Sequence, residues 1–227
     1  ISTNGVNGKL TVTVLEDFTT SRVTFKNPTS NKPTSTNEIV IDGKGKKLSY
    51  SGNDAALVLD GVSYLTIKNL TIENTANNSD NKGIQFMGNA QYNTIDGCTI
   101  SFPNQTSSST STTSGGAYVV FSNSLTSMNS STSSYHNGSY NTVQNCTMTT
   151  KANSNGPTSA IHVYGSSSKY TSTAANNTFK NNTIKNFYRY GFYDYYSNGD
   201  QFVNNDVSND VNTSRYISST VYMMYSY

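Results

Sequence analysis

The chain has 227 residues, only 12% of which are charged, and its formal net charge is +2. Ser, Thr and Asn dominate the composition, and Tyr is frequent, whereas strong helix formers are few. This composition excludes a helical bundle, a coiled coil and an α/β nucleotide-binding enzyme. No basic stripe extends beyond Lys44, Lys46 and Lys47, so nucleic acid is not an expected partner.

Residues 1–37 contain two short runs typical of strands, 10–14 (LTVTV) and 22–25 (RVTF), before a turn-rich stretch. We expect this region to form a first coil of a repeat array or an N-terminal cap on it. The chain starts at Ile1 without an apolar leader, which predicts a removed signal or a segment of a longer chain. No apolar run approaches the roughly 18 residues of a spanning helix, so we expect no membrane span.

Residues 38–225 repeat a nine-residue pattern. Its fourth and ninth positions are apolar, and its sixth is Asn or Gly, which tolerate a positive φ. We expect two short strands joined by a left-handed bend at Asn69, Gly97, Asn145, Asn181 and Asn204, and at Gly43 in a weaker first copy. The copies are 64–72 (YLTIKNLTI), 92–100 (YNTIDGCTI), 140–148 (YNTVQNCTM), 176–184 (NNTFKNNTI) and 199–207 (GDQFVNNDV).

A second pattern, small–apolar–any–apolar, alternates with the first. Three short strands per coil predict an all-β fold, a right-handed parallel β-helix of about six coils, as one domain over residues 1–227. A β-sandwich would need hairpin turns at regular intervals, which the sequence lacks. The segments are 56–59 (ALVL), 83–86 (GIQF), 117–120 (AYVV), 160–163 (AIHV), 191–194 (GFYD) and 220–223 (TVYM).

Two Ser/Thr-rich inserts, 103–116 and 122–139, leave the predicted coils as neighbouring loops. The seventh position of the first pattern points inward after the bend. It places Cys98 and Cys146 above one another on coils about 4.8 Å apart, as free buried thiols, with a disulfide or a metal pair as the alternative. Asn182 and Asn205 follow at the same position and should form an amide ladder.

Residues 65–72 (LTIKNLTI) and 39–45 (IVIDGKG) resemble coils of the pectate-lyase-like superfamily. The pattern of 92–100, a Ser/Thr-rich insert and 191–196 (GFYDYY) is similar to the β-helix arrays in very large adhesin-like surface proteins of gliding bacteria. The resemblance covers roughly residues 38–225 and implies a secreted or cell-surface bacterial protein. It bears on fold far more than on function.

The sequence lacks the catalytic signature of the resembled family. Pectinolytic hydrolases of this fold carry an Asn-Thr-Asp segment, an Asp-Asp pair, a His-Gly and an Arg-x-Lys, and none of these occurs here. Glycoside cleavage by acid and base needs paired carboxylates. A calcium-dependent lyase would need clustered carboxylates and a base. We expect no cofactor, and Ca²⁺ is the one alternative. Its ligands and base would have to come from Asp194, Asp200, Asp206, Asp210, Arg189 and Arg215.

Arg189, Asp194 and His162 are the weak catalytic candidates. His162 takes the outward position of its strand and His136 lies in an insert, so we expect hydrogen-bonded histidines without a catalytic role. Asp194 takes a register that elsewhere holds inward apolar residues. It is therefore expected either as a buried, hydrogen-bonded carboxyl or at a strand bulge.

The outward positions of the second pattern are rich in aromatic residues. Such a row indicates either a ligand-binding surface, in which tyrosines hold sugar rings, or a face that the inserts cover. The candidate ligand-binding residues are Phe121, His162, Tyr164, Tyr193, Tyr195 and Tyr222.

The favoured hypothesis is an exported, non-catalytic module for adhesion or glycan binding. A polysaccharide lyase and a structural spacer in a surface fibre are the alternatives. The expected partners are a glycan or other surface ligand and, because residues 220–224 match the repeat without a capping segment, flanking coils of the same polypeptide or a capping partner.

Overall fold

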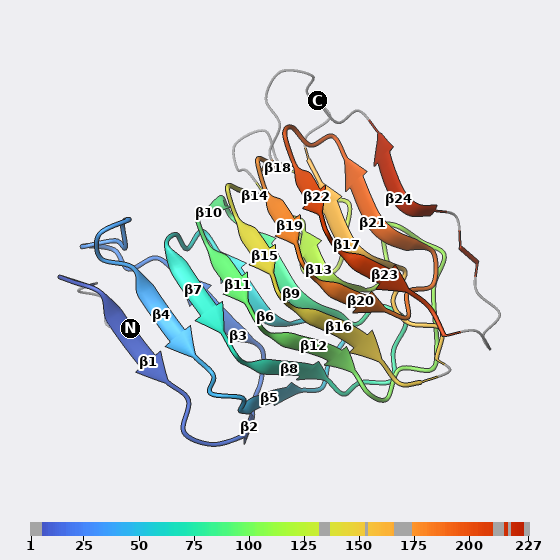
Figure 1. Cartoon of the computed structure of the whole chain (residues 1–227), viewed down its shortest axis with the longest axis horizontal. Coiled ribbons are helices and arrows are strands. Elements are labelled where there is room, and N and C mark those ends of the chain that lie inside the picture. The colour runs from blue at the N-terminus through green and yellow to red at the C-terminus, as the bar shows by residue number, and fades with distance from the viewer. Residues whose placement is uncertain are drawn as a thin grey trace.

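The computed structural model describes residues 6–131, 137–152, 154–165, 174–210, 216–217 and 219–224. Its strands form three sheets of seven parallel strands each. All three sheets extend along the same long axis, which the strands cross (Figure 1). The chain passes from the first sheet to the second and the third, and then returns to the first one rung further on. The predicted right-handed parallel β-helix is confirmed.

In the part of the chain that the structure describes, the helix has seven coils, one more than expected, because residues 10–26 supply one strand to each sheet. The first sheet contains β1 (Leu10–Thr13), β4 (Ile39–Asp42), β7 (Leu65–Lys68), β11 (Thr94–Asp96), β15 (Thr142–Gln144), β19 (Thr178–Lys180) and β22 (Gln201–Val203). The second contains β2 (Phe18–Thr19), β5 (Lys47–Tyr50), β8 (Thr71–Asn74), β12 (Thr99–Phe102), β16 (Thr147–Thr150), β20 (Thr183–Lys185) and β23 (Asp206–Ser208).

The third sheet contains β3 (Val23–Lys26), β6 (Ala55–Asp60), β9 (Lys82–Met87), β13 (Ala117–Phe121), β17 (Ser159–Tyr164), β21 (Tyr190–Tyr195) and β24 (Ser219–Met224). A small sheet of β10 (Ala90–Gln91), β14 (Gly138–Ser139) and β18 (Ala174–Ala175) precedes the first sheet in the middle coils. Within the described ranges, no helix is long and apolar enough to cross a membrane.

The apolar positions of the nine-residue pattern fill the interior of the coils. Ile67, Ile95 and Val143 lie in register on adjacent strands of the first sheet and are fully buried. Ile72 and Ile100 do the same in the second sheet. Each coil thus buries its apolar side chains against the coils above and below, which is the main stabilising term of a solenoid.

The bends between the first and second sheets have the predicted backbone. Asn69, Asn145, Asn181 and Asn204 have φ of 53°, 54°, 55° and 52°, and Gly97 has φ of 61°.

The prediction for Gly43 is wrong, because Lys44 (φ 51°) and Gly45 (φ 76°) make that turn. Gly43 is required for space instead, since a Cβ there would lie 2.5 Å from the backbone oxygen of Asn69.

The first position of the pattern is also left-handed, which the sequence did not predict. Tyr64, Tyr92 and Tyr140 have φ of 53°, 55° and 58°, although this region is unfavourable for a bulky side chain. Their rings stack in both pairs with centroids 5.0 Å apart and an interplanar angle of 10°. Stacking of this kind contributes about 0.5–1.5 kcal/mol per pair and so offsets backbone strain.

The seventh position carries two kinds of interior contact. Cys98 and Cys146 are free and buried on adjacent coils, as predicted. The Oδ1 of Asn205 accepts hydrogen bonds from the backbone N–H and the side-chain amide of Asn182, at 3.0 and 2.9 Å. The predicted amide ladder is confirmed, and it continues upward because Asn182 Oδ1 accepts from the backbone N–H of Cys146 at 2.9 Å.

A second amide ladder occupies the second position of the pattern. Asn141 Oδ1 accepts from the backbone N–H and the side-chain amide of Asn93, at 3.1 and 2.9 Å. Asn177 Oδ1 accepts in the same way from Asn141, at 3.0 and 3.1 Å. Asp200 ends the ladder below Asn177. Each rung satisfies polar groups that the interior would otherwise leave unpaired.

Candidate ligand-binding site

The C-terminal strands of the third sheet bring all four candidate tyrosines together. In register, His162 pairs with Tyr193, which pairs with Tyr222, and Tyr164 pairs with Tyr195. Side chains alternate between the faces of a strand, so these two rows lie on the outer face of β17, β21 and β24.

The rings in these rows stand nearly parallel. The centroid distance is 5.2 Å between Tyr193 and Tyr222, 5.7 Å between Tyr164 and Tyr195, and 6.0 Å between Tyr193 and Tyr195. The corresponding interplanar angles are 7°, 8° and 13°. A group of parallel phenols combines apolar ring surface with hydroxyls that can donate and accept hydrogen bonds.

A depression of about 370 Å³ lies at these rings. At its edge, the guanidinium carbon of Arg189 lies 4.8 Å from the ring centroid of Tyr190, and Nη1 donates to the carbonyl oxygen of Thr110 at 2.5 Å. The positively charged side chain of Arg189 is therefore held beside the aromatic rings. The described residues that line the depression include no carboxylate; they are Thr112, Asn129, Tyr164, Arg189, Tyr190, Tyr193, Tyr195, Tyr222 and Met224.

Burial raises the pKa of Tyr193 and of Tyr164 above the usual value of a phenol. The neighbouring phenol of Tyr222 adds to the effect at Tyr193, and a hydrogen bond with Thr112 opposes it. Both phenols therefore stay protonated at neutral pH, so they can donate a hydrogen bond to a ligand as well as accept one.

Residues 103–116 and 122–131, which flank β13 and which we together call the cover, lie over the middle of the same face. Gln85 on β9 donates from Nε2 to the carbonyl oxygens of Ser122 and Ser124, at 2.8 and 2.9 Å. Met128 packs on Val120 of β13, and both are fully buried. The sequence allowed either a face covered by the inserts or a ligand-binding surface, and each applies to different strands. The cover encloses the outer face of β9 and β13, while the tyrosines line a depression on β21 and β24.

His162 lies under the cover, not at the surface. Its Nε2 is 2.8 Å from Asn129 Oδ1, and its Nδ1 is 3.3 Å from Ser159 Oγ. An amide oxygen can only accept, so Nε2 carries the proton and Nδ1 accepts from Ser159. The ring stacks on Tyr193 with a centroid distance of 4.4 Å. His162 is fully buried, so it supports the wall of the depression and does not face a ligand.

Phe121 is a core residue, which corrects its assignment as a ligand-binding candidate. The register pairs Phe121 with Phe86 and Val163, and it pairs Val120 with His162. The segment 117–120 is thus shifted by one residue from the predicted alignment, and a one-residue shift exchanges the two faces of a strand. The Phe121 ring stacks on Phe86 with a centroid distance of 4.3 Å inside the coil.

The three weak catalytic candidates do not meet. Asp194 pairs in register with Val163 and Met223 and is fully buried. Arg189 lines the depression on the outer face, and His162 lies beneath the cover. The sheet separates Asp194 from the other two, so the three side chains cannot act on one substrate.

The aspartates considered as calcium ligands are dispersed. Asp200 accepts from Asn177, and Asp210 accepts from Asn186 Nδ2 at 2.8 Å, whereas Asp206 is exposed. No group of three His, Cys, Asp or Glu side chains forms in the part of the chain that the structure describes. His136 and Arg215 lie outside the described residues.

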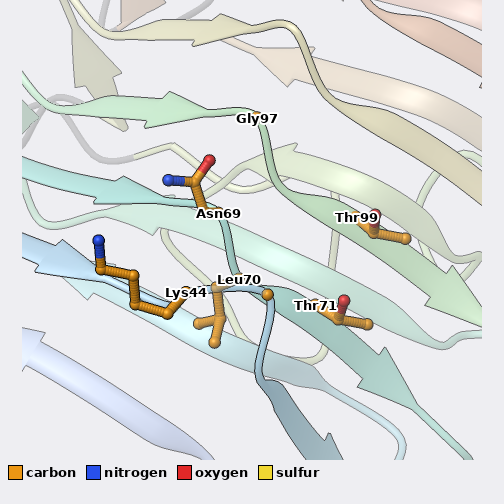
Figure 2. Close-up of a pocket in the computed structure, with 7 residues that line it drawn as sticks. Lys44, Asn69, Leu70, Thr71, Gly97 and Thr99 are labelled. Atoms are coloured by element: carbon orange, nitrogen blue, oxygen red, sulfur yellow. The ribbon is translucent and has the colours of Figure 1, made fainter. Parts of the chain in front are cut away.

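A second hollow, of about 450 Å³, lies on the outer bend between the first and second sheets, and sequence reasoning missed it. Figure 2 shows Asn69 on one bend, the bare backbone of Gly97 on the next, and Thr71 and Thr99 on the strands that follow. Gly97 interrupts the column of bend asparagines and so leaves the hollow. The described lining contains no aromatic ring, which favours the tyrosine depression as the candidate site.

No family model and no curated protein matches the chain. Among solved structures, the chain is similar to pectate lyase Pel9A, with a TM-score of 0.42 and 9% sequence identity. The alignment covers 91% of this chain and 68% of the other. The assignment of the fold rests on the register of the three parallel sheets described above.

Proposed function

We propose that the protein is a non-catalytic β-helix module that binds a glycan in the tyrosine depression. The observation that supports this is the convergence of four near-parallel tyrosines with Arg189, Thr112 and Asn129 around one hollow. Tyrosine rings offer apolar contact to the C–H groups of a sugar, while hydroxyl, amide and guanidinium groups bond its hydroxyls. Polar groups converging at an aromatic pocket are the usual form of a small-ligand site.

The charges around the depression favour binding over cleavage. Acid–base cleavage of a glycosidic bond uses two carboxyl groups on either side of the bond. The described lining of the depression has none, and Asp194 faces the opposite side of the sheet. Arg189, held against Tyr190 and Thr110, fits a role in orienting the ligand.

We propose further that the module is exported to a bacterial cell surface, where glycan binding mediates adhesion. The support is the composition: side chains are predominantly short hydroxyl and amide groups, with 12% charged residues and an estimated pI of about 8.4. Secretion of the natural protein is tested directly by fractionating the source cells and detecting the chain with an antibody.

Glycan binding is tested on a glycan array with the wild-type chain and with Tyr195→Ala and Tyr222→Ala. We expect a defined set of glycans to bind and each variant to weaken binding on the order of tenfold, which corresponds to about 1.4 kcal/mol.

The matched control is Tyr140→Asn, which removes an exposed, stacked tyrosine from the bend between β14 and β15, away from the depression. Asn occupies the same pattern position with φ of 55° at Asn176, so this control keeps the backbone. Equal binding by all variants, or no glycan bound at all, would contradict the proposal.

A further inference from the structure

One side of the tyrosine depression is closed by a wall that is fixed to the sheet. Asn129 of the cover is bonded to His162 on β17 at 2.8 Å. Its Nδ2 donates to Thr112 Oγ1 at 3.4 Å, and the neighbouring Met128 N–H donates to the carbonyl oxygen of Thr113 at 2.7 Å. The wall is therefore anchored both to the outer face of β17 and within the cover.

A second side is closed where β21 begins. Arg189 immediately precedes this strand, and its hydrogen bond to Thr110 joins the strand to the cover. The guanidinium group also packs over the ring of Tyr190. The cover and the sheet are thus bridged on this side as well as at Asn129.

Exposure of the lining side chains increases away from these two walls. His162 is 0% exposed and Tyr193 6% exposed, whereas Met224 on the last strand is 36% exposed. Among the residues that the structure describes, the lining is therefore least enclosed toward β24 and toward the ends of β17 and β21, where Tyr164 and Tyr195 lie. The depression has a volume of about 370 Å³, roughly that of a dozen water molecules at ~30 Å³ each. This volume is too small to hold a long stretch of an extended polymer.

From this geometry we infer that the depression receives the terminal residues of a glycan chain and excludes its interior. A chain lying along the helix axis runs into Asn129 and Thr112, and a chain crossing along β21 runs into Arg189. This specificity rests on the proposed function, because it concerns what the same tyrosines bind.

The test is calorimetry with oligosaccharides of increasing length. The probes are malto-, cello-, chito- and manno-oligosaccharides from the disaccharide to the hexasaccharide. α-Cyclodextrin, a cyclic glucose hexamer without chain ends, is compared with the linear maltohexaose. For a class that binds, we expect one protein per oligosaccharide and an affinity that stays within about twofold beyond the shortest ligand that fills the site. If the maltose series binds, α-cyclodextrin should not compete.

Two outcomes separate this inference from the proposed function. Binding of several proteins along one hexasaccharide, or equal binding of α-cyclodextrin and maltohexaose, would overturn the chain-end inference and leave glycan binding intact. No binding in any series, together with a blank array, would refute both.

A wall variant gives an independent measurement. Asn129→Ala removes the side chain that ends the depression, and Thr126→Ala on the exposed surface of the same insert is its control. We expect Asn129→Ala to admit longer chains, so that affinity rises several-fold from trisaccharide to hexasaccharide, while the control keeps the wild-type length profile. A flat profile in Asn129→Ala, with its fold intact by circular dichroism, would show that this wall does not limit chain length.

Discussion

Asp200 Oδ1 accepts hydrogen bonds from both the backbone N–H and the side-chain amide of Asn177, at 2.7 and 3.2 Å. An aspartate thus fills a rung that asparagine fills in the three preceding coils. Burial raises the pKa of Asp200 well above its usual value, and the charge of Asp194 raises it further. The ladder therefore ends on a carboxyl group whose ionisation is disfavoured by its surroundings.

Asp200→Asn should stabilise the fold at neutral pH. The amide keeps the acceptor for Asn177 and removes the cost of a buried ionisable group, so we expect a gain on the order of 1–2 kcal/mol. Because the folded pKa is raised, the wild-type protein loses stability as the pH rises from about 3.8 through that pKa, and the variant should not. Urea denaturation at pH 4 and pH 7 measures both effects. A variant less stable than wild type at pH 7 would contradict this account.

Asn141→Ala should destabilise the fold strongly. Asn93 would lose the acceptor for its backbone N–H and its side-chain amide, and Asn141 Nδ2 would no longer donate to the Ala90 carbonyl. Buried groups left unpaired cost about 1–3 kcal/mol each, so we expect a loss of roughly 2–4 kcal/mol. The control is Thr147→Ala on an exposed strand position, which should change stability by less than about 0.5 kcal/mol. Similar midpoints for the two variants would refute the role of the ladder.

Asn145→Val should lower the melting temperature, whereas Asn145→Gly should change it little. Asn145 has φ of 54°, a region in which a β-branched residue is strained by about 1–3 kcal/mol and glycine is not. Differential scanning calorimetry of the two variants separates this backbone effect from the loss of the Asn145 bond to Asp96 Oδ1, which both lack. Equal melting temperatures would show that the bend tolerates any residue.

His162 should make the fold less stable in acid. Burial, followed by the charge of Lys82, lowers the pKa of His162 from 6.5 to about 3. Between these values the unfolded chain binds a proton that the folded chain does not, so stability falls as the pH drops from 6.5 toward 3, by an amount on the order of a few kcal/mol. Guanidinium unfolding of wild type and His162→Gln at pH 7 and pH 4 should show a smaller pH dependence in the variant. Parallel pH profiles would mean that His162 is not the responsible group.

Uronide polymers should not be cleaved. With pectin or alginate, and with or without added calcium, we expect no unsaturated product above background, because the described lining of the depression has no carboxylates that could hold the calcium ion of a lyase. Absorbance at the wavelength of the unsaturated uronide is the measurement. Product formation that Arg189→Ala or Asp194→Ala abolishes would favour the lyase alternative.

Much of the coil could be predicted from sequence because its contacts repeat with the chain. The apolar fourth and ninth positions and the left-handed sixth position at Asn69 and Asn145 follow from side-chain alternation and backbone sterics, which are local. Asn182 and Asn205 stack for the same reason. Gly43 was misassigned because glycine serves either a positive φ or a close approach of backbone, and only the neighbouring coil distinguishes the two.

The site depended on contacts between segments far apart in the sequence. A one-residue difference in the alignment of residues 117–120 placed Phe121 in the core, because strand register is set by pairing with β9 and β17. The bonds from the cover to His162 and Arg189 cannot be derived from a Ser/Thr-rich stretch that has no periodicity. The sequence by itself determined a stack of coils with tyrosines on one outer face, since each repeat carries its own strand and bend signals. Only the tertiary structure decided which of those tyrosines remain accessible, because burial depends on where a long insert docks.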